Sequence, residues 1–142
     1  MFATIRAVAV GFAVAAAGLA HGPAQAQALN LQLEEWCDGR GDVSDDVRIS
    51  SCTAIINSGH YDAHDLNVAY YHRGYWYADT FRYELAIADF TQAIRYDPRD
   101  VDAYWLRYLS KKKLGDIAGA EADYNAAKRI DPTIEDQWVY PP

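Results

Sequence analysis

The residues of this chain best suited to bind a metal ion are two histidines spaced four apart, His60 and His64. Two carboxylates, Asp62 and Asp65, lie beside them, and imidazole with carboxylate is a common ligand set for a divalent metal. On a single helix this spacing would bring both rings to one face. The preceding Ser-Gly pair favours a turn instead. A polar loop between helices is therefore the preferred interpretation, and a metal-dependent enzyme using His60 and His64 is the least favoured of three functional hypotheses.

No set of side chains suited to covalent or acid–base catalysis can be assembled from the sequence. A serine nucleophile needs a neighbouring general base, and Ser50 and Ser51 lie near no histidine in any predicted element. The motifs G-x-S-x-G and G-x-G-x-x-G and the phosphate-binding P-loop are absent from the sequence. Two acidic pairs, Glu34-Glu35 and Asp45-Asp46, are expected at helix starts, where they complement the helix dipole. We therefore expect no enzymatic activity and no cofactor or metal.

The overall composition is that of a globular protein with an acidic surface. Hydrophobic residues make up 51% of the 142 residues and aromatic residues 13%, which is too apolar for a disordered chain. The formal net charge is −7, so the chain lacks the basic footprint that binding to nucleic acid requires. A single domain is expected at this length.

Residues 1–26 have the pattern of a secretory signal peptide. Arg6 precedes an uncharged run over Ala7–Ala20, and the small-residue pattern Ala24-Gln25-Ala26 follows that run. The run of roughly 14 apolar residues is shorter than the roughly 20 that a membrane-spanning helix needs. We therefore predict cleavage near Ala26 and a mature protein that is periplasmic and not stably inserted in the membrane.

Three segments of the second half of the chain recur at an interval of 34 residues. Each unit predicts two helices, at 68–80 and 83–96 in the first unit and at 101–114 and 117–130 in the second. Asp65, Asp100 and Asp116 are expected as N-caps. One helical hairpin cannot bury its apolar stripe alone, so neighbouring hairpins must stack. The recurring segments are Ala69-Tyr70-Tyr71 with Ala103-Tyr104-Trp105, Ala86–Phe90 with Ala120–Tyr124, and Ala93–Pro98 with Ala127–Pro132.

These residues resemble the tetratricopeptide repeat, a family whose period is 34 residues. The resemblance covers residues 67–132 and implies an all-α fold, an α-α superhelix of about three helical hairpins. It places repeats at 67–100 and 101–134, followed by a C-terminal tail at 135–142. The matching positions are Tyr70, Gly74, Tyr77, Ala86, Phe90, Ala93 and Pro98 in the first unit and Tyr104, Leu114, Gly115, Ala120, Tyr124, Ala127 and Pro132 in the second.

Three positions depart from the family pattern. Arg73 and Arg107 stand where the family usually has leucine, and Tyr108 stands where a small residue is usual. We expect Gly119 to make room for the Tyr108 ring.

Residues 27–66 are interpreted as a degenerate helical hairpin one period before the first repeat. Cys52 takes the place that Ala86 holds in that repeat, and Cys37 would lie on the facing helix. An even cysteine count in an exported chain favours a disulfide. A zinc site is the alternative, although two thiols without a histidine cluster are a poor ligand set. A bond between Cys37 and Cys52 would staple this hairpin.

Aromatic side chains are in excess on the first helix of each repeat. Rings within residues 70–77 point all round the helix, so one core stripe cannot hold them all. In the family that the chain resembles, the first helices line the concave surface, and large rings with polar tips are favoured at binding hot spots. The alternative is that the rings pack against neighbouring helices. Carrying over the groove positions predicts a binding groove of Tyr71, Tyr75, Asp79, Trp105, Leu109 and Lys112.

The resemblance implies a non-catalytic adaptor or scaffold whose concave face binds a peptide or protein partner of the cell envelope. A self-associating structural protein of the envelope, for example a homodimer, is the second hypothesis, because no polar capping helix follows the last repeat. Trp138, Val139 and Tyr140 are expected to cover the exposed end of the stack.

Overall fold

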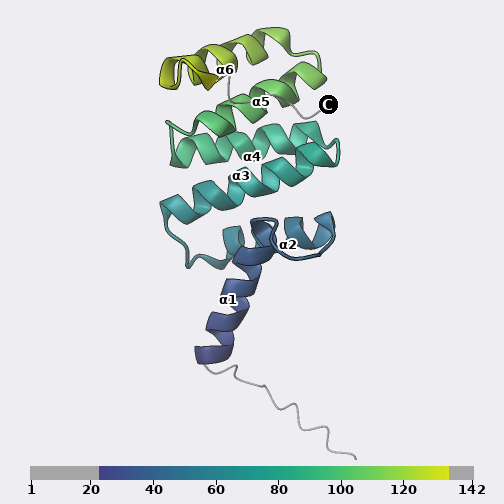
Figure 1. Ribbon diagram of the computed structural model, residues 1–142, viewed down its shortest axis with the longest axis vertical. Helices are drawn as coiled ribbons and strands as arrows, with labels where there is room; N and C mark the ends of the chain where they lie inside the picture. Colours follow the sequence, from purple (N-terminus) through teal and green to yellow (C-terminus); the bar gives the residue numbers. More distant parts are fainter. Residues whose placement is uncertain (1–22, 135–142) are drawn as a thin grey trace, which may run out of the picture.

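The structure, a computed structural model, describes residues 23–134, which form a stack of α-helices joined by short loops (Figure 1). Consecutive helices pack against each other along the whole stack, as hairpins α1–α2, α3–α4 and α5–α6 and across the junctions between hairpins. The predicted all-α architecture of three hairpins is confirmed. The helices are α1 (Pro23–Cys37), α2 (Asp45–Ser58), α3 (Ala63–Asp79), α4 (Tyr83–Tyr96), α5 (Val101–Lys113) and α6 (Ile117–Ile130).

Some predictions concern residues outside the described range. Most of the predicted signal peptide lies there, and the cleavage point predicted near Ala26 falls in the first turn of α1. The tail at 135–142, which was expected to cover the end of the stack, lies outside it as well. Within residues 23–134, no helix combines the length and apolar character needed to span a bilayer.

Capping side chains set the starts of the helices in the last repeat. Asp100 and Asp116 are N-caps as predicted, and Asp116 accepts the backbone N–H of Gly119 at 3.0 Å. A Cβ at Gly119 would collide with the Asp116 carboxylate, and Tyr108 is not among its nearest neighbours. The prediction that Gly119 makes room for Tyr108 is therefore wrong, because this glycine instead lets the capping carboxylate approach.

The start of α3 also differs from the prediction. Asp62 is its N-cap and accepts the N–H groups of His64 and Asp65, at 2.8 and 3.0 Å. Asp65, which was predicted as the cap, is the third residue of a capping box and accepts the N–H of Asp62. The helix therefore begins at Ala63, earlier than expected, and extends toward the N-terminal hairpin.

The two helices of the first repeat pack closely at a glycine. Phe90 of α4 is fully buried over Gly74 of α3, where a Cβ would lie 2.8 Å from the ring. In the second repeat Tyr108 takes the place of Gly74, and its ring centroid lies 5.6 Å from that of Tyr124. A pair of large rings thus replaces the glycine–phenylalanine contact, which explains how the repeat accepts a tyrosine at a position that usually holds a small residue.

We expect Gly74→Ala to destabilise the protein by a net amount on the order of 1 kcal/mol. Overpacking a tight core costs about 1–3 kcal/mol, which exceeds the roughly 1 kcal/mol that alanine gains over glycine in a helix. Urea unfolding measures the difference. Adding Phe90→Leu should reduce the effect of Gly74→Ala, and strictly additive losses would contradict the contact.

The N-terminal hairpin is crosslinked and docked on α3. Cys37 and Cys52 form the predicted disulfide, with their Cα atoms 4.8 Å apart and both side chains buried. Trp76 of α3 donates its indole N–H to the carbonyl of Cys37 at 2.9 Å. Gly39, at φ +87°, lets the loop after α1 pass against the Trp76 ring. The guanidinium of Arg48, a residue of α2, lies 4.6 Å from the centroid of the same ring.

Candidate partner-binding face

The first helices of neighbouring hairpins are in contact, although α1 reaches α3 only near its C-terminal end (Figure 1). α3 contacts both α1 and α5 in addition to its partner α4. On each of these helices, residues three or four apart share one face. The surface called the first-helix face below is defined by one such stripe on α3 and one on α5, which consist of Val68, Tyr71, Tyr75, Asp79, Asp102, Leu109 and Lys112.

Five of the six predicted groove residues belong to this face and reach its surface to different extents. Tyr75 is 38% exposed, and Asp79 and Lys112 are also exposed. Tyr71 and Leu109 are half-buried and pack against the core of the first repeat. Asp102 of the face is exposed as well, so the exposed part of the face is one large ring with two acids and a base.

Trp105, the sixth predicted groove residue, is only 8% exposed. It packs with Ala127 and Ile134, and its ring centroid lies 5.0 Å from that of Tyr108. These are the contacts of a core residue, as in the alternative in which the rings pack against neighbouring helices. We therefore leave Trp105 out of the first-helix face.

The Tyr75 ring is held in place although it is exposed. Its centroid lies 4.8 Å from that of Trp76, edge to face. Trp76 is itself fixed by its hydrogen bond to Cys37 of the N-terminal hairpin. An aromatic side chain that is already ordered loses little entropy on binding, which favours its use as an anchor.

The hydroxyl of Tyr71 lies near carboxylates. Burial, followed by the Asp102 and Asp100 carboxylates, raises the pKa of Tyr71 above its usual value. The hydroxyl therefore remains protonated and able to donate at any physiological pH. At the α5 end of the face, the Lys112 ammonium lies 3.0 Å from the Tyr108 hydroxyl.

Two buried ion pairs hold the hairpins together behind this face. Arg73 of α3 donates to both carboxylate oxygens of Asp89 on α4, at 2.7 and 2.8 Å. Arg107 of α5 donates in the same way to Asp123 on α6, at 2.8 and 2.6 Å. Both aspartates are buried. These pairs explain why arginine stands at the two positions where the family usually has leucine.

Each of these arginines also reaches the preceding hairpin. Arg73 donates to the hydroxyl of Thr53 on α2, and Arg107 donates to that of Thr91 on α4, both at 3.0 Å. One guanidinium thus joins the two helices of its own hairpin to the hairpin before it.

Comparison with family models agrees with this geometry. Residues 68–100, which include most of α3 and all of α4, match the model described as tetratricopeptide repeat. The chain contains a tetratricopeptide repeat. A search among curated proteins gave no match. Tetratricopeptide repeats generally mediate protein–protein interaction, and proteins of this family are generally non-catalytic adaptors.

The residues considered for metal binding are not gathered into one site in this repeat protein. His60 lies in the loop after α2, where Gly59 ends the helix at φ +69°, and His64 lies in the first turn of α3. Among residues 23–134, no three His, Cys, Asp or Glu side chains are grouped as metal ligands. The turn predicted from the Ser-Gly pair is confirmed.

Sequence reasoning misplaced Glu34 and missed the two buried aspartates. Glu34 was expected at a helix start but lies in the last turn of α1, because that helix begins at Pro23. Asp45 and Asp46 do occupy the first turn of α2 as predicted. The signal for Asp89 and Asp123 was present, since each recurs at the repeat interval together with its arginine.

His72, beside the first-helix face, gives a prediction for pH dependence. Burial lowers the pKa of His72 below its ordinary value of 6.5, while Asp38, 3.7 Å from its Nε2, acts in the opposite direction. The unfolded chain therefore takes up the proton first as the pH falls below about 6.5, and His72 contributes a loss of stability there. We expect its imidazole resonance to titrate below pH 6.5, and Asp38→Asn to lower the midpoint further. A midpoint raised by Asp38→Asn would contradict this assignment.

Proposed function

We propose that this tetratricopeptide-repeat protein is a non-catalytic periplasmic adaptor that binds a segment of another cell-envelope protein on the first-helix face. The observation that carries the proposal is the exposed Tyr75 ring, which packs against Trp76 and shares the first-helix face with the exposed Asp79 and Lys112. A rigid aromatic anchor on a face with charged residues is the usual composition of a binding hot spot and its rim.

The periplasmic location is supported by two features of the chain. The first 26 residues have the pattern of an export signal. Cys37 and Cys52 form a disulfide, and such bonds persist mainly in oxidising compartments.

Site-specific photo-crosslinking in cells tests the proposed face. A photoreactive residue in place of Tyr75 should capture a partner that the same residue in place of Ala88, exposed on the second helix α4, does not capture. With the identified partner purified, Tyr75→Ala should weaken binding at least about tenfold, the effect of losing a hot-spot ring. Tyr96→Ala is the matched control, because Tyr96 is 41% exposed and lies on α4. Equal losses from both variants would reject the first-helix face.

A self-associating structural role is the second candidate function. It is favoured by exposed apolar residues at the turns that connect the two helices of each repeat. Phe81 is 78% exposed at φ +61°, where the next repeat has Gly115 at φ +79°. Leu85, Leu114 and Ile117, which are 48%, 43% and 55% exposed, lie beside the same two turns. A second copy of the chain is the occupant that this candidate requires. Sedimentation as a monomer at all accessible concentrations would dismiss it.

A further inference from the structure

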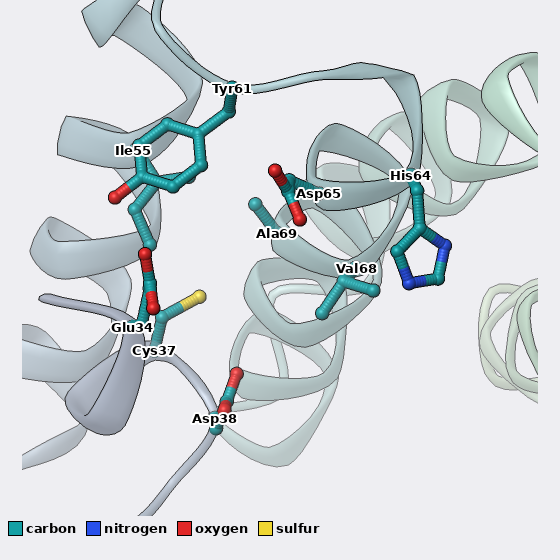
Figure 2. A pocket seen from close by; sticks show the side chains of 9 residues that line it. All are labelled: Glu34, Cys37, Asp38, Ile55, Tyr61, His64, Asp65, Val68 and Ala69. Atoms are coloured by element: carbon teal, nitrogen blue, oxygen red, sulfur yellow. The ribbon is translucent and has the colours of Figure 1, made fainter. Parts of the chain in front are cut away.

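A cavity of about 200 Å³ opens between the N-terminal hairpin and the start of α3 (Figure 2). Its walls come from the end of α1, from α2 and the loop after it, and from the first turns of α3. Val68, one of its lining residues, also belongs to the first-helix face, so the cavity is continuous with that face. It is smaller than the roughly 300–1,000 Å³ typical of a small-molecule site. A single long side chain is a better match for its size.

The polar wall of the cavity is acidic. Glu34 and Asp38 come from the end of α1 and Asp65 from α3, and Figure 2 shows all three carboxylates around the opening. No lysine or arginine lines the cavity. Asp38 already pairs with Arg40 at 2.9 Å, and Asp65 accepts a backbone N–H in the capping box. Neither Glu34 nor Asp65 forms an ion pair within the described part of the chain, so both charges are available to a cation.

Tyr61, beside Glu34, supplies a second indication of a missing ligand. Its hydroxyl is buried, and it makes no hydrogen bond of ordinary geometry in the structure. Burial, followed by a hydrogen bond outside ordinary geometry to the Glu34 carboxylate and by its charge, raises the pKa of Tyr61 to about 12. A buried hydroxyl whose hydrogen bond is poorly formed is unfavourable, and such a group is normally satisfied by a better-placed donor or acceptor. An N–H donor between Tyr61 and Glu34 would satisfy both groups.

Apolar side chains also line the cavity, with Ile55 on the side of Glu34 and Tyr61, and Val68 and Ala69 on the side of Asp65 (Figure 2). Ile55 and Ala69 are buried in the core that surrounds the disulfide. Apolar side chains beside carboxylates fit a side chain that has a hydrocarbon stem and a charged head, because lysine and arginine bury the stem and keep the head at polar groups.

We propose that this cavity receives the lysine or arginine side chain of a basic segment in the partner, with its stem against Val68 and its cationic head between Glu34 and the Tyr61 hydroxyl. The proposal rests on the proposed function, since it assigns one subsite of the face that binds the partner. Charge-assisted hydrogen bonds to the carboxylate would then select a basic segment. The chain's net charge of −7 would speed the encounter with such a segment.

Titration of the isotope-labelled mature protein with two small probes tests the cavity directly. The probes are N-acetyl-lysine methylamide and N-acetyl-norleucine methylamide, which share the hydrocarbon stem and differ in the ammonium group. We expect the lysine probe to shift the backbone amide resonances of Tyr61, Asp65 and Ala69 several-fold more than the norleucine probe. Glu34→Gln should abolish that difference and leave the rest of the spectrum in place. Tyr61→Phe should weaken it without unfolding the hairpin.

Three results would overturn the proposal. Equal shifts from the two probes would mean that the ammonium is not recognised, and shifts unaffected by Glu34→Gln would mean that the cation binds elsewhere. Calcium ions producing the same shifts at lower concentration would identify the cavity as a metal site instead.

Tyr75→Ala separates this proposal from the proposed function. Tyr75 does not line the cavity, so this variant should bind the lysine probe as the wild type does. A partner that crosslinks at Tyr75, with no response to the lysine probe, would reject the cavity and leave the proposed face standing. A normal response to the probe, with no crosslinked partner, would reject the proposed face alone.

Discussion

Asp89→Ala is expected to lower the free energy of unfolding by about 3–5 kcal/mol, the cost of leaving one member of a buried ion pair without its partner. Arg73 is the residue left behind, and its side chain is only 16% exposed. Single domains are typically stable by about 5–15 kcal/mol, so this one change would remove a large share of the stability. Urea unfolding followed by circular dichroism measures it. Glu84→Ala, at an exposed acid of the same helix, should change stability little.

A double substitution distinguishes the charge effect from a packing effect. Arg73→Met with Asp89→Leu replaces the ion pair by apolar side chains of similar size, and such replacements are often neutral or stabilising. We therefore expect the double variant to recover most of the stability lost in Asp89→Ala. Equal destabilisation of the two variants would show that the pair matters for its shape rather than for its charge. Asp123→Ala should cost at least as much as Asp89→Ala, because Lys111 also pairs with Asp123, at 2.8 Å.

Replacement of both cysteines by alanine is expected to destabilise the protein by about 3 kcal/mol, the loop-entropy value for a crosslink spanning about 15 residues. The sequence separation of Cys37 and Cys52 is 15. The loss should be concentrated in α1 and α2, because α3–α6 have their own core around Phe90 and their own ion pairs. Hydrogen exchange should therefore show faster opening of residues 23–58 than of residues 83–130.

Reduction of the wild-type protein should reproduce the effect of the double alanine variant, and a reductant should not affect that variant. Trp76 offers a second readout, since its indole N–H is bonded to the carbonyl of Cys37. Its fluorescence should change when the hairpin opens. Unchanged exchange in α1 and α2 after loss of the disulfide would contradict the expected role of the crosslink.

The bounds of the repeat helices could be predicted closely because capping residues mark their starts and prolines follow their ends. Asp100 and Asp116 cap the helices of the last repeat, and Pro98 and Pro132 follow the ends of α4 and α6 at the repeat interval. The start of α3 was harder to place, since Asp62 and Asp65 can both cap a helix. Only the three-dimensional arrangement shows that they act together as one capping box.

The candidate site was less predictable than the fold because its residues depend on neighbours that do not repeat. Tyr71 and Trp105 occupy the same position in successive repeats, yet Tyr71 reaches the surface and Trp105 is buried beside Ile134. The cavity is lined by Glu34 of α1, by Tyr61 in the loop after α2 and by Val68 of α3. The residues of α1 do not follow the sequence pattern of the two repeats. Periodicity predicts which residues share a stripe and does not predict which stripe a neighbour covers.

The arginines shared between hairpins also affect how the molecule comes apart. In a stack of independent units, each hairpin could open at its own temperature, and the end units would fray first. Here Arg73 and Arg107 each hold an aspartate within one hairpin and a threonine in the preceding one. Opening one unit therefore removes part of the internal bonding of the next. With the disulfide intact, residues 45–130 should then melt in a single transition, and a surface built across several hairpins keeps its spacing until the whole stack is lost.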